Sequence, residues 1–138
     1  MLRRLSQLRR RVAARRSAEE AEALLELARL SFLQLQRAWD HADLGAMKKM
    51  ATAPLLEDLR EQLAQRGPEP NRTEVLRLDA RLLGVEELTE AFVASVEFSG
   101  LIREQQDGSA LPFRELWLLA NVKSAGRGWK LARVQSLS

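Results

Sequence analysis

Apolar residues in the first half of the chain recur at steps of three and four. Between residues 18 and 42 these positions are Ala21, Leu24, Leu25, Ala28, Phe32, Leu35 and Trp39. This spacing is typical of a helix that buries one face. The segment 43–50, which Asp43 can cap, predicts a short second helix. Residues 52–67 predict a third, because Pro54 suits a first turn and Leu55, Leu59 and Leu63 share one face.

The pattern changes after the proline-containing connector at residues 67–71. Residues 75–82 alternate apolar and polar side chains, and residues 92–98 do the same, as half-buried strands do. Turns are predicted at residues 86–89 and 105–109, and further strands at residues 113–123 and 129–135. Ser99 and Gly100 predict a bulge in the second strand. Helices followed by an antiparallel meander indicate a single α+β domain.

The N-terminal segment has a different composition. The 138 residues include 22 basic and 19 acidic side chains, a net charge of +3. Residues 1–16 contain seven arginines and no acid, which leaves 15 basic (22 less 7) against 19 acidic residues in 17–138, a net charge of −4. The chain is therefore predicted to be a basic arm, residues 1–16, followed by an acidic domain, residues 17–138.

The arm also carries an apolar stripe. Leu2, Leu5, Leu8 and Val12 follow one another at helical spacing. An isolated helix of this length is marginal in water, so we expect the arm to fray until a surface orders it. Ser17 and Glu20 match a capping box, which predicts that the first helix of the domain begins at Ser17.

Few side chains suited to catalysis are present. The chain has no Cys and no Tyr, and His41 is its one histidine. A lone histidine lacks the partners that a metal site or an acid–base pair needs, so we interpret His41 as a solvated residue at a helix end. We expect no catalytic residues, no metal and no cofactor, and a protein that is not an enzyme.

Aromatic side chains offer a candidate pocket. A helix over a curved sheet can leave an open mouth, and six residues could line it: Phe32, Trp39, Phe92, Phe98, Trp117 and Trp129. The alternative is that these residues form a closed core.

A series of short segments, in order, resembles the Tim-44-like domain family, in its bacterial branch. The segments are Phe32 to Asp40, Asp43-Leu44, Ala51 to Leu59, Val93 to Ile102, Glu115-Leu116-Trp117 and Gly128 to Ala132 before Gln135. The family is the C-terminal domain of a mitochondrial inner-membrane import translocase subunit together with its bacterial relatives. The resemblance covers about residues 20 to 136.

The resemblance implies a cone-shaped fold of the nuclear-transport-factor-two-like type, with N-terminal helices packed on a curved four-stranded antiparallel sheet. It also implies an inner-membrane domain that contacts anionic, cardiolipin-like lipid and docks a protein partner of a membrane complex. We place lipid contact on the arm, at Leu2, Arg3, Arg4, Leu5, Leu8, Arg9, Arg10 and Arg11. A peripheral protein, or one anchored by an upstream segment, is expected on the cytoplasmic face.

Other functions remain open at this point. The chain could be a soluble protein-interaction module whose arm is a tail or a targeting segment. The same fold hosts enzymes, but their chemistry relies on Tyr donors with Asp, or on His. This chain has no Tyr, and its one histidine, His41, lies in a helix-end segment outside the predicted strands. Specific nucleic-acid binding is not expected, because the remainder of the chain is acidic and no aromatic residue lies among the arginines.

Overall fold

The computed structural model describes the backbone of residues 2–104 and 108–137 and the side chains of residues 17–104 and 108–137. Three helices come first: α1 (Leu2–Asp40), α2 (Leu44–Met50) and α3 (Ala53–Arg66). The Asp43 side chain accepts a hydrogen bond from the Ala46 N–H and caps α2, as predicted. Thr52 precedes α3, and Gly67, at φ 90°, ends it.

The prediction that a helix begins at Ser17 is wrong. Helix α1 is continuous for 39 residues and passes through Ser17 and Glu20 without a break. No Gly or Pro occurs before residue 45, and most residues on both sides of Ser17 favour helix, so nothing in the sequence ends the arm helix there. The capping-box pattern also fits a helix interior, because Ser and Glu are both tolerated within helices.

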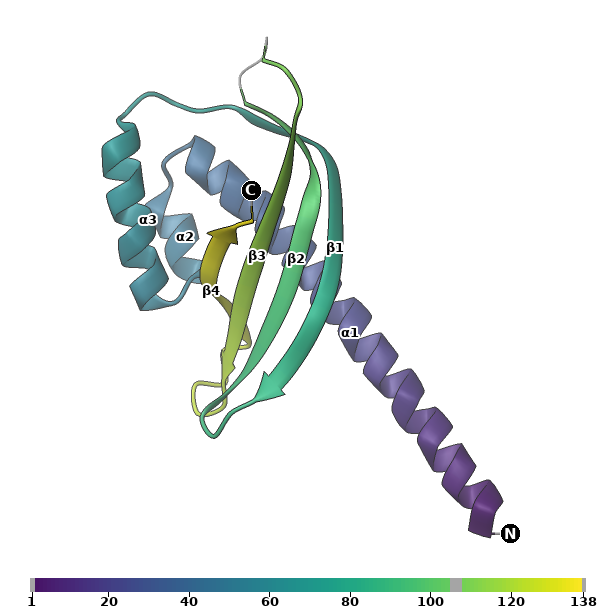
Figure 1. Ribbon diagram of the computed structural model, residues 1–138. Coiled ribbons are helices and arrows are strands. Elements are labelled where there is room, and N and C mark those ends of the chain that lie inside the picture. Colours follow the sequence, from purple (N-terminus) through teal and green to yellow (C-terminus); the bar gives the residue numbers. More distant parts are fainter. Residues whose placement is uncertain (1, 105–107, 138) are drawn as a thin grey trace.

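Four strands follow and form one antiparallel sheet in the order β1-β2-β3-β4. The strands are β1 (Thr73–Glu87), β2 (Ala91–Glu104), β3 (Leu111–Val122) and β4 (Trp129–Ser136). Figure 1 shows the sheet curving against α1, with α2 and α3 beside β4. The turn predicted at residues 105–109 falls largely outside the described residues. The predicted turn at 86–89 begins later, since β1 runs through Glu87.

The bulge predicted at Ser99 and Gly100 is also wrong. Both residues pair regularly with β1, and the register shifts lie in β1 itself, between Val75 and Arg77 and again further along the strand. A Cβ atom on Gly100 would lie 1.9 Å from the Arg77 carbonyl oxygen. Glycine is therefore required here for a close backbone approach, which is the other common reason for a glycine within a strand.

The core lies between α1 and the inner face of the sheet. Phe32 is 1% exposed, and its ring centroid lies 4.9 Å from that of Phe98, 5.4 Å from Phe113 and 5.3 Å from Trp117. Alternate β2 residues point inward, and α3 contributes the predicted Leu55, Leu59 and Leu63. Among the described residues the buried set is entirely apolar. The aromatic cluster fixes α1 to the sheet.

Candidate functional site: the α1–sheet groove and the arm

The N-terminal part of α1 extends beyond the sheet. In Figure 1 this purple segment runs out from the end of the sheet at which the β1–β2 and β3–β4 turns lie. Its backbone is helical, whereas the arm is predicted to fray. The side chains assigned to lipid contact lie outside the described part of the chain: Leu2, Arg3, Arg4, Leu5, Leu8, Arg9, Arg10 and Arg11. What the structure establishes is their position on one continuous helix.

An open groove lies where α1 leaves the sheet, and we call it the α1–sheet groove. It has a volume of about 690 Å³. Helix α1 contributes Ser17, Glu20, Ala21, Ala23, Leu24 and Leu27, and the strands contribute Leu82, Val85, Phe92, Asn121 and Trp129. Most of these side chains are apolar, and Ser17 adjoins the last arginine of the arm. The groove wall and the basic segment are thus consecutive parts of one helix.

The structure brings together two of the six candidate pocket residues. Phe92 and Trp129 line the α1–sheet groove. Phe32, Phe98 and Trp117 are at most 1% exposed and form the packed core. Trp39 lines a separate cavity near the other end of α1. The single aromatic pocket that the sequence suggested is therefore divided among a closed core and two distinct hollows.

Several apolar side chains of the strands and turns are exposed, and one of them, Val85, lines the α1–sheet groove. Val85 and Leu88 are 49% and 50% exposed, and Val122 is 41% exposed. The Lys123 ammonium donates a hydrogen bond of 2.7 Å to Glu87 and lies 4.8 Å from the centroid of the ring of Phe92, which lines the groove. Lys123 thus links the β3–β4 turn to the end of β1.

The cavity that contains Trp39 has a volume of about 360 Å³ and lies between α1, α3 and β4. Glu115 projects into it from β3, and burial raises the pKa of the Glu115 carboxyl, an effect partly offset by a hydrogen bond of 2.9 Å from the Trp117 indole N–H. The sequence reasoning missed Glu115. Glu115 shares the inward face of β3 with Phe113, Trp117 and Leu119, because these residues lie at every second position. This alternation in the sequence could have predicted that Glu115 is buried.

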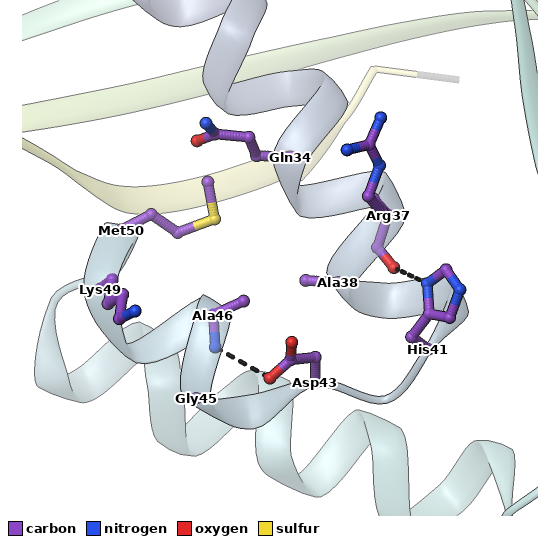
Figure 2. Close-up of a pocket in the computed structure, with 9 residues that line it drawn as sticks. All are labelled: Gln34, Arg37, Ala38, His41, Asp43, Gly45, Ala46, Lys49 and Met50. Carbon is purple, nitrogen blue, oxygen red and sulfur yellow. Dashed lines mark hydrogen bonds between the residues drawn. The ribbon is translucent and has the colours of Figure 1, made fainter.

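A third hollow, at the junction of α1 and α2, contains His41 (Figure 2). The His41 Nδ1–H donates a hydrogen bond of 2.8 Å to the Arg37 carbonyl oxygen, and the histidine is exposed, as expected of a residue at a helix end. Asp43 is engaged in capping α2. Among the described residues, no group of three or more His, Cys, Asp or Glu side chains could hold a metal ion.

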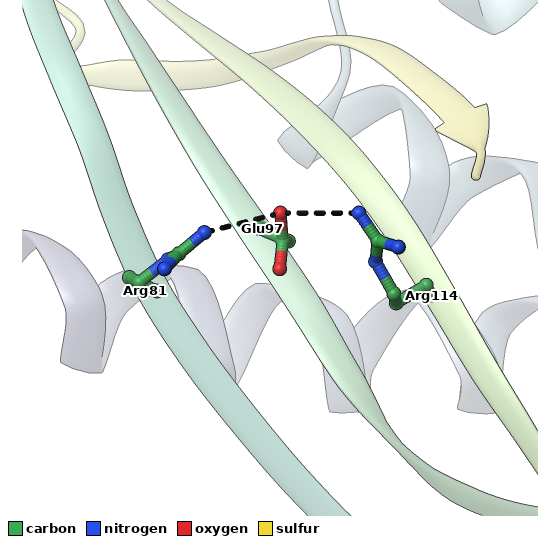
Figure 3. A network of polar contacts seen from close by, with 3 residues as sticks. All are labelled: Arg81, Glu97 and Arg114. Carbon is green, nitrogen blue, oxygen red and sulfur yellow. Dashed lines mark ion pairs between the residues drawn. The ribbon is translucent and has the colours of Figure 1, made fainter.

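On the outer face of the sheet, Glu97 connects two arginines (Figure 3). Its carboxylate lies 3.5 Å from the Arg81 guanidinium and 3.6 Å from that of Arg114. The three residues belong to β1, β2 and β3, so the ion pairs link neighbouring strands. Both arginines are more than half exposed, and pairs of this kind contribute at most about 1 kcal/mol each. This network stabilises the sheet modestly.

The helices and the curved antiparallel sheet define the nuclear transport factor 2 (NTF2)-like fold. The chain is similar to an NTF2-like superfamily protein from Salmonella enterica serovar Typhimurium, with a TM-score of 0.50 and 12% sequence identity over 87% of this chain and 91% of that one. At this identity the likeness shows the fold alone. No family model matches the chain, and no curated protein matches it. Within the described residues, none of the helices has the length and apolar content needed to cross a bilayer.

Proposed function

We propose that this protein is a non-catalytic domain that binds anionic membrane lipid through its arm, with the α1–sheet groove holding the apolar part of a lipid. The observation that supports this most directly is the continuity of α1. The first part of this helix, up to Arg16, carries seven arginines and no acid, and the part that follows forms one wall of an apolar groove. A phosphate group and an acyl chain can therefore be bound by adjacent parts of the same element.

The charge of the arm supports membrane attachment. A basic residue near an anionic bilayer contributes on the order of 1 kcal/mol before screening. The seven arginines of residues 1–16 together provide several kcal/mol, and Leu2, Leu5 and Leu8 add apolar burial. Because the arm is already helical, less conformational entropy is lost on binding than for a disordered tail.

The groove suits an acyl chain better than a polar ligand. Its walls are formed by side chains such as Leu24, Leu82 and Trp129, and its volume of about 690 Å³ is in the range of small-molecule sites. Glu20 is the one ionisable group among its lining residues. A lipid whose headgroup lies against the arm would thus place its apolar part next to Ala21 and Phe92.

We also propose that the chain is a relative of the Tim-44-like domains. The ordered segments that resemble that family, and the NTF2-like fold, support this relationship. It implies a place at a bacterial inner membrane, on the cytoplasmic face, with a protein partner in a membrane complex.

Vesicle flotation tests the proposal. The full chain should float with vesicles that contain cardiolipin and remain unbound with purely zwitterionic vesicles. Deletion of residues 1–16 should abolish flotation, while circular dichroism and thermal unfolding verify that residues 17–138 remain folded. Equal flotation with both vesicle types, or full binding after the deletion, would contradict the proposal and favour a protein-interaction module.

The groove has its own test. Val85→Glu places a carboxylate in the groove, whereas Leu88→Glu makes the same change at a residue of equal exposure that does not line it. Val85→Glu should reduce uptake of a fluorescent fatty-acyl probe, and Leu88→Glu should not. If both variants bind the probe as the unmodified protein does, the groove is not an acyl site.

A further inference from the structure

Helix α1 has a second apolar face, opposite the core. Leu30 and Leu33 are 53% and 44% exposed on this face, and Leu27 is 38% exposed beside it. Ala28 and Phe32, on the inward face, are at most 1% exposed. A helix that only covers a sheet presents polar residues outward. The exposed leucines therefore indicate a surface that can bind another helix.

In the sequence, the spacing of these outward positions extends back to Leu2 as a heptad pattern. Starting at Leu2, alternating steps of three and four residues reach Leu2, Leu5, Arg9, Val12, Arg16, Glu19, Ala23, Glu26, Leu30 and Leu33. We call this set the outer seam. These are the a and d positions of a coiled coil, and the described members from Glu19 onward are all exposed. The inward residues Ala21, Ala28 and Leu35 fall at f, the position opposite the seam.

The outer seam is complementary to itself in the antiparallel direction. When two copies run in opposite directions and pair residues whose numbers add to 35, every a position meets a d position. The five pairs, each occurring twice, are Leu2 with Leu33, Leu5 with Leu30, Arg9 with Glu26, Val12 with Ala23, and Arg16 with Glu19. Each leucine in the seam thus faces a leucine, the valine faces an alanine, and each arginine faces a glutamate.

We propose that the outer seam binds a second copy of this chain as an antiparallel coiled coil. Parallel pairing is disfavoured, because each of the four charged seam residues would face the same residue of the other chain and be repelled by its like charge. These residues are Arg9, Arg16, Glu19 and Glu26. The antiparallel arrangement is two-fold symmetric, with the axis at the step from Ser17 to Ala18, so it closes as a dimer. The arm of each chain lies along the outer side of α1 in the other chain.

The geometry of the fold leaves room for this partner. The sheet covers α1 from one side only, and the arm extends past the end of the sheet (Figure 1). The paired segment of residues 2–33 is about 48 Å long at 1.5 Å per residue. Each domain therefore sits at an opposite end of the helix pair, with its sheet facing away from the seam.

The dimer does not depend on lipid binding, but the two share residues. Leu2, Leu5 and Arg9 are assigned both to the seam and to the bilayer, so anionic vesicles compete with the second copy for the arm. Ala23 belongs both to the seam and to the lining of the α1–sheet groove. Arg3 and Arg10 occupy heptad position b, outside the seam. The two proposals can therefore be tested on different residues, and dimerisation is measured without lipid.

Charge reversal with rescue is the direct test, by analytical ultracentrifugation of the full chain. The unmodified protein should be a dimer in the micromolar range. Arg9→Glu with Arg16→Glu should raise the dissociation constant at least ~30-fold, because four attractive pairs become repulsive. Glu19→Arg with Glu26→Arg should do the same. An equimolar mixture of these two variants should restore a dimer, because every pair is again of opposite charge.

Arg3→Glu with Arg10→Glu is the matched control, since it reverses the same number of charges outside the seam and should leave the dimer intact. A monomeric unmodified protein, or failure of the mixed variants to associate, would overturn the proposal. So would a control that dissociates as strongly as the seam variant.

Disulfide trapping establishes the direction of pairing, and the absence of native cysteine makes the result unambiguous. Val12→Cys and Ala23→Cys chains, mixed and mildly oxidised, should form a covalent heterodimer, and neither chain should cross-link to itself. Self-linking of Val12→Cys chains alone would indicate parallel pairing and contradict the antiparallel register.

Discussion

Replacement of Phe32 by alanine should be among the most damaging single changes in the molecule. The Phe32 side chain is 1% exposed and contacts the rings of Phe98, Phe113 and Trp117 at centroid distances of 4.9, 5.4 and 5.3 Å. Truncation of a buried phenylalanine costs about 3–5 kcal/mol. Three aromatic contacts place Phe32→Ala at the upper end of that range. Single domains are stable by about 5–15 kcal/mol, so the variant should be close to unfolding.

Guanidinium chloride unfolding, followed by circular dichroism and tryptophan fluorescence, measures the loss. The denaturant concentration at the midpoint of unfolding should fall sharply, and the dependence of the unfolding free energy on denaturant concentration should be unchanged. Circular dichroism and fluorescence should report the same single transition. Gln34→Ala, an exposed position on the same helix, should change the unfolding free energy by no more than about 0.5 kcal/mol. A loss below about 1 kcal/mol for Phe32→Ala would refute the account in which the aromatic cluster fixes α1 to the sheet.

Three further predictions concern single residues. Gly100→Ala should destabilise the protein by about 1–3 kcal/mol or more in thermal unfolding, because its Cβ would overlap the Arg77 carbonyl oxygen; an unchanged melting temperature would contradict the close approach. The Asp40 carboxylate accepts hydrogen bonds of 2.8 and 2.9 Å from the Thr73 N–H and hydroxyl. Asp40→Ala removes both acceptors and should lower the free energy of unfolding, measured with denaturant, by about 1–3 kcal/mol; a loss as small as that of an exposed surface substitution would contradict this role. The pKa of Glu115 is raised above its usual value of 4.5, so wild-type stability should fall as pH rises through the folded pKa. Glu115→Gln should therefore have a higher free energy of unfolding than wild type at neutral pH, and this difference should disappear below pH 4.5. A difference that does not change with pH would exclude a buried carboxyl that ionises.

Periodicity predicted most of the fold, because local patterns here agree with the burial that tertiary packing imposes. The inward positions of α1 and α3, the capping by Asp43 and the alternation in β2 all follow from side-chain spacing. Where two physical explanations share one pattern, sequence alone could not choose between them. Ser17 with Glu20 fits both a helix start and a helix interior, and Gly100 fits both a bulge and a close approach.

The site was less accessible to sequence reasoning, because it depends on which residues from distant strands meet. Composition separated the basic arm from the acidic remainder, but only the continuous α1 connects the arm to a groove. Phe92 and Trp129 meet at one end of the sheet while Trp117 lies in the core, a difference set by strand register rather than residue type. Glu115 escaped notice because a carboxylate on an inward-facing position departs from the usual pattern.

The most direct test of membrane attachment through the arm is the affinity of the full chain for cardiolipin-containing vesicles, compared with a variant in which Arg3, Arg4, Arg10 and Arg11 are replaced by glutamine. These four arginines lie outside the outer seam, so the variant keeps the dimer pairing. Four arginines at roughly 1 kcal/mol each correspond to nearly three orders of magnitude in affinity before screening by salt. The account therefore predicts that the affinity of the variant falls by at least about two orders of magnitude, and that added salt weakens binding of the unmodified protein toward the same level. An unchanged affinity in the variant would contradict the claim that the arm is the membrane-binding element.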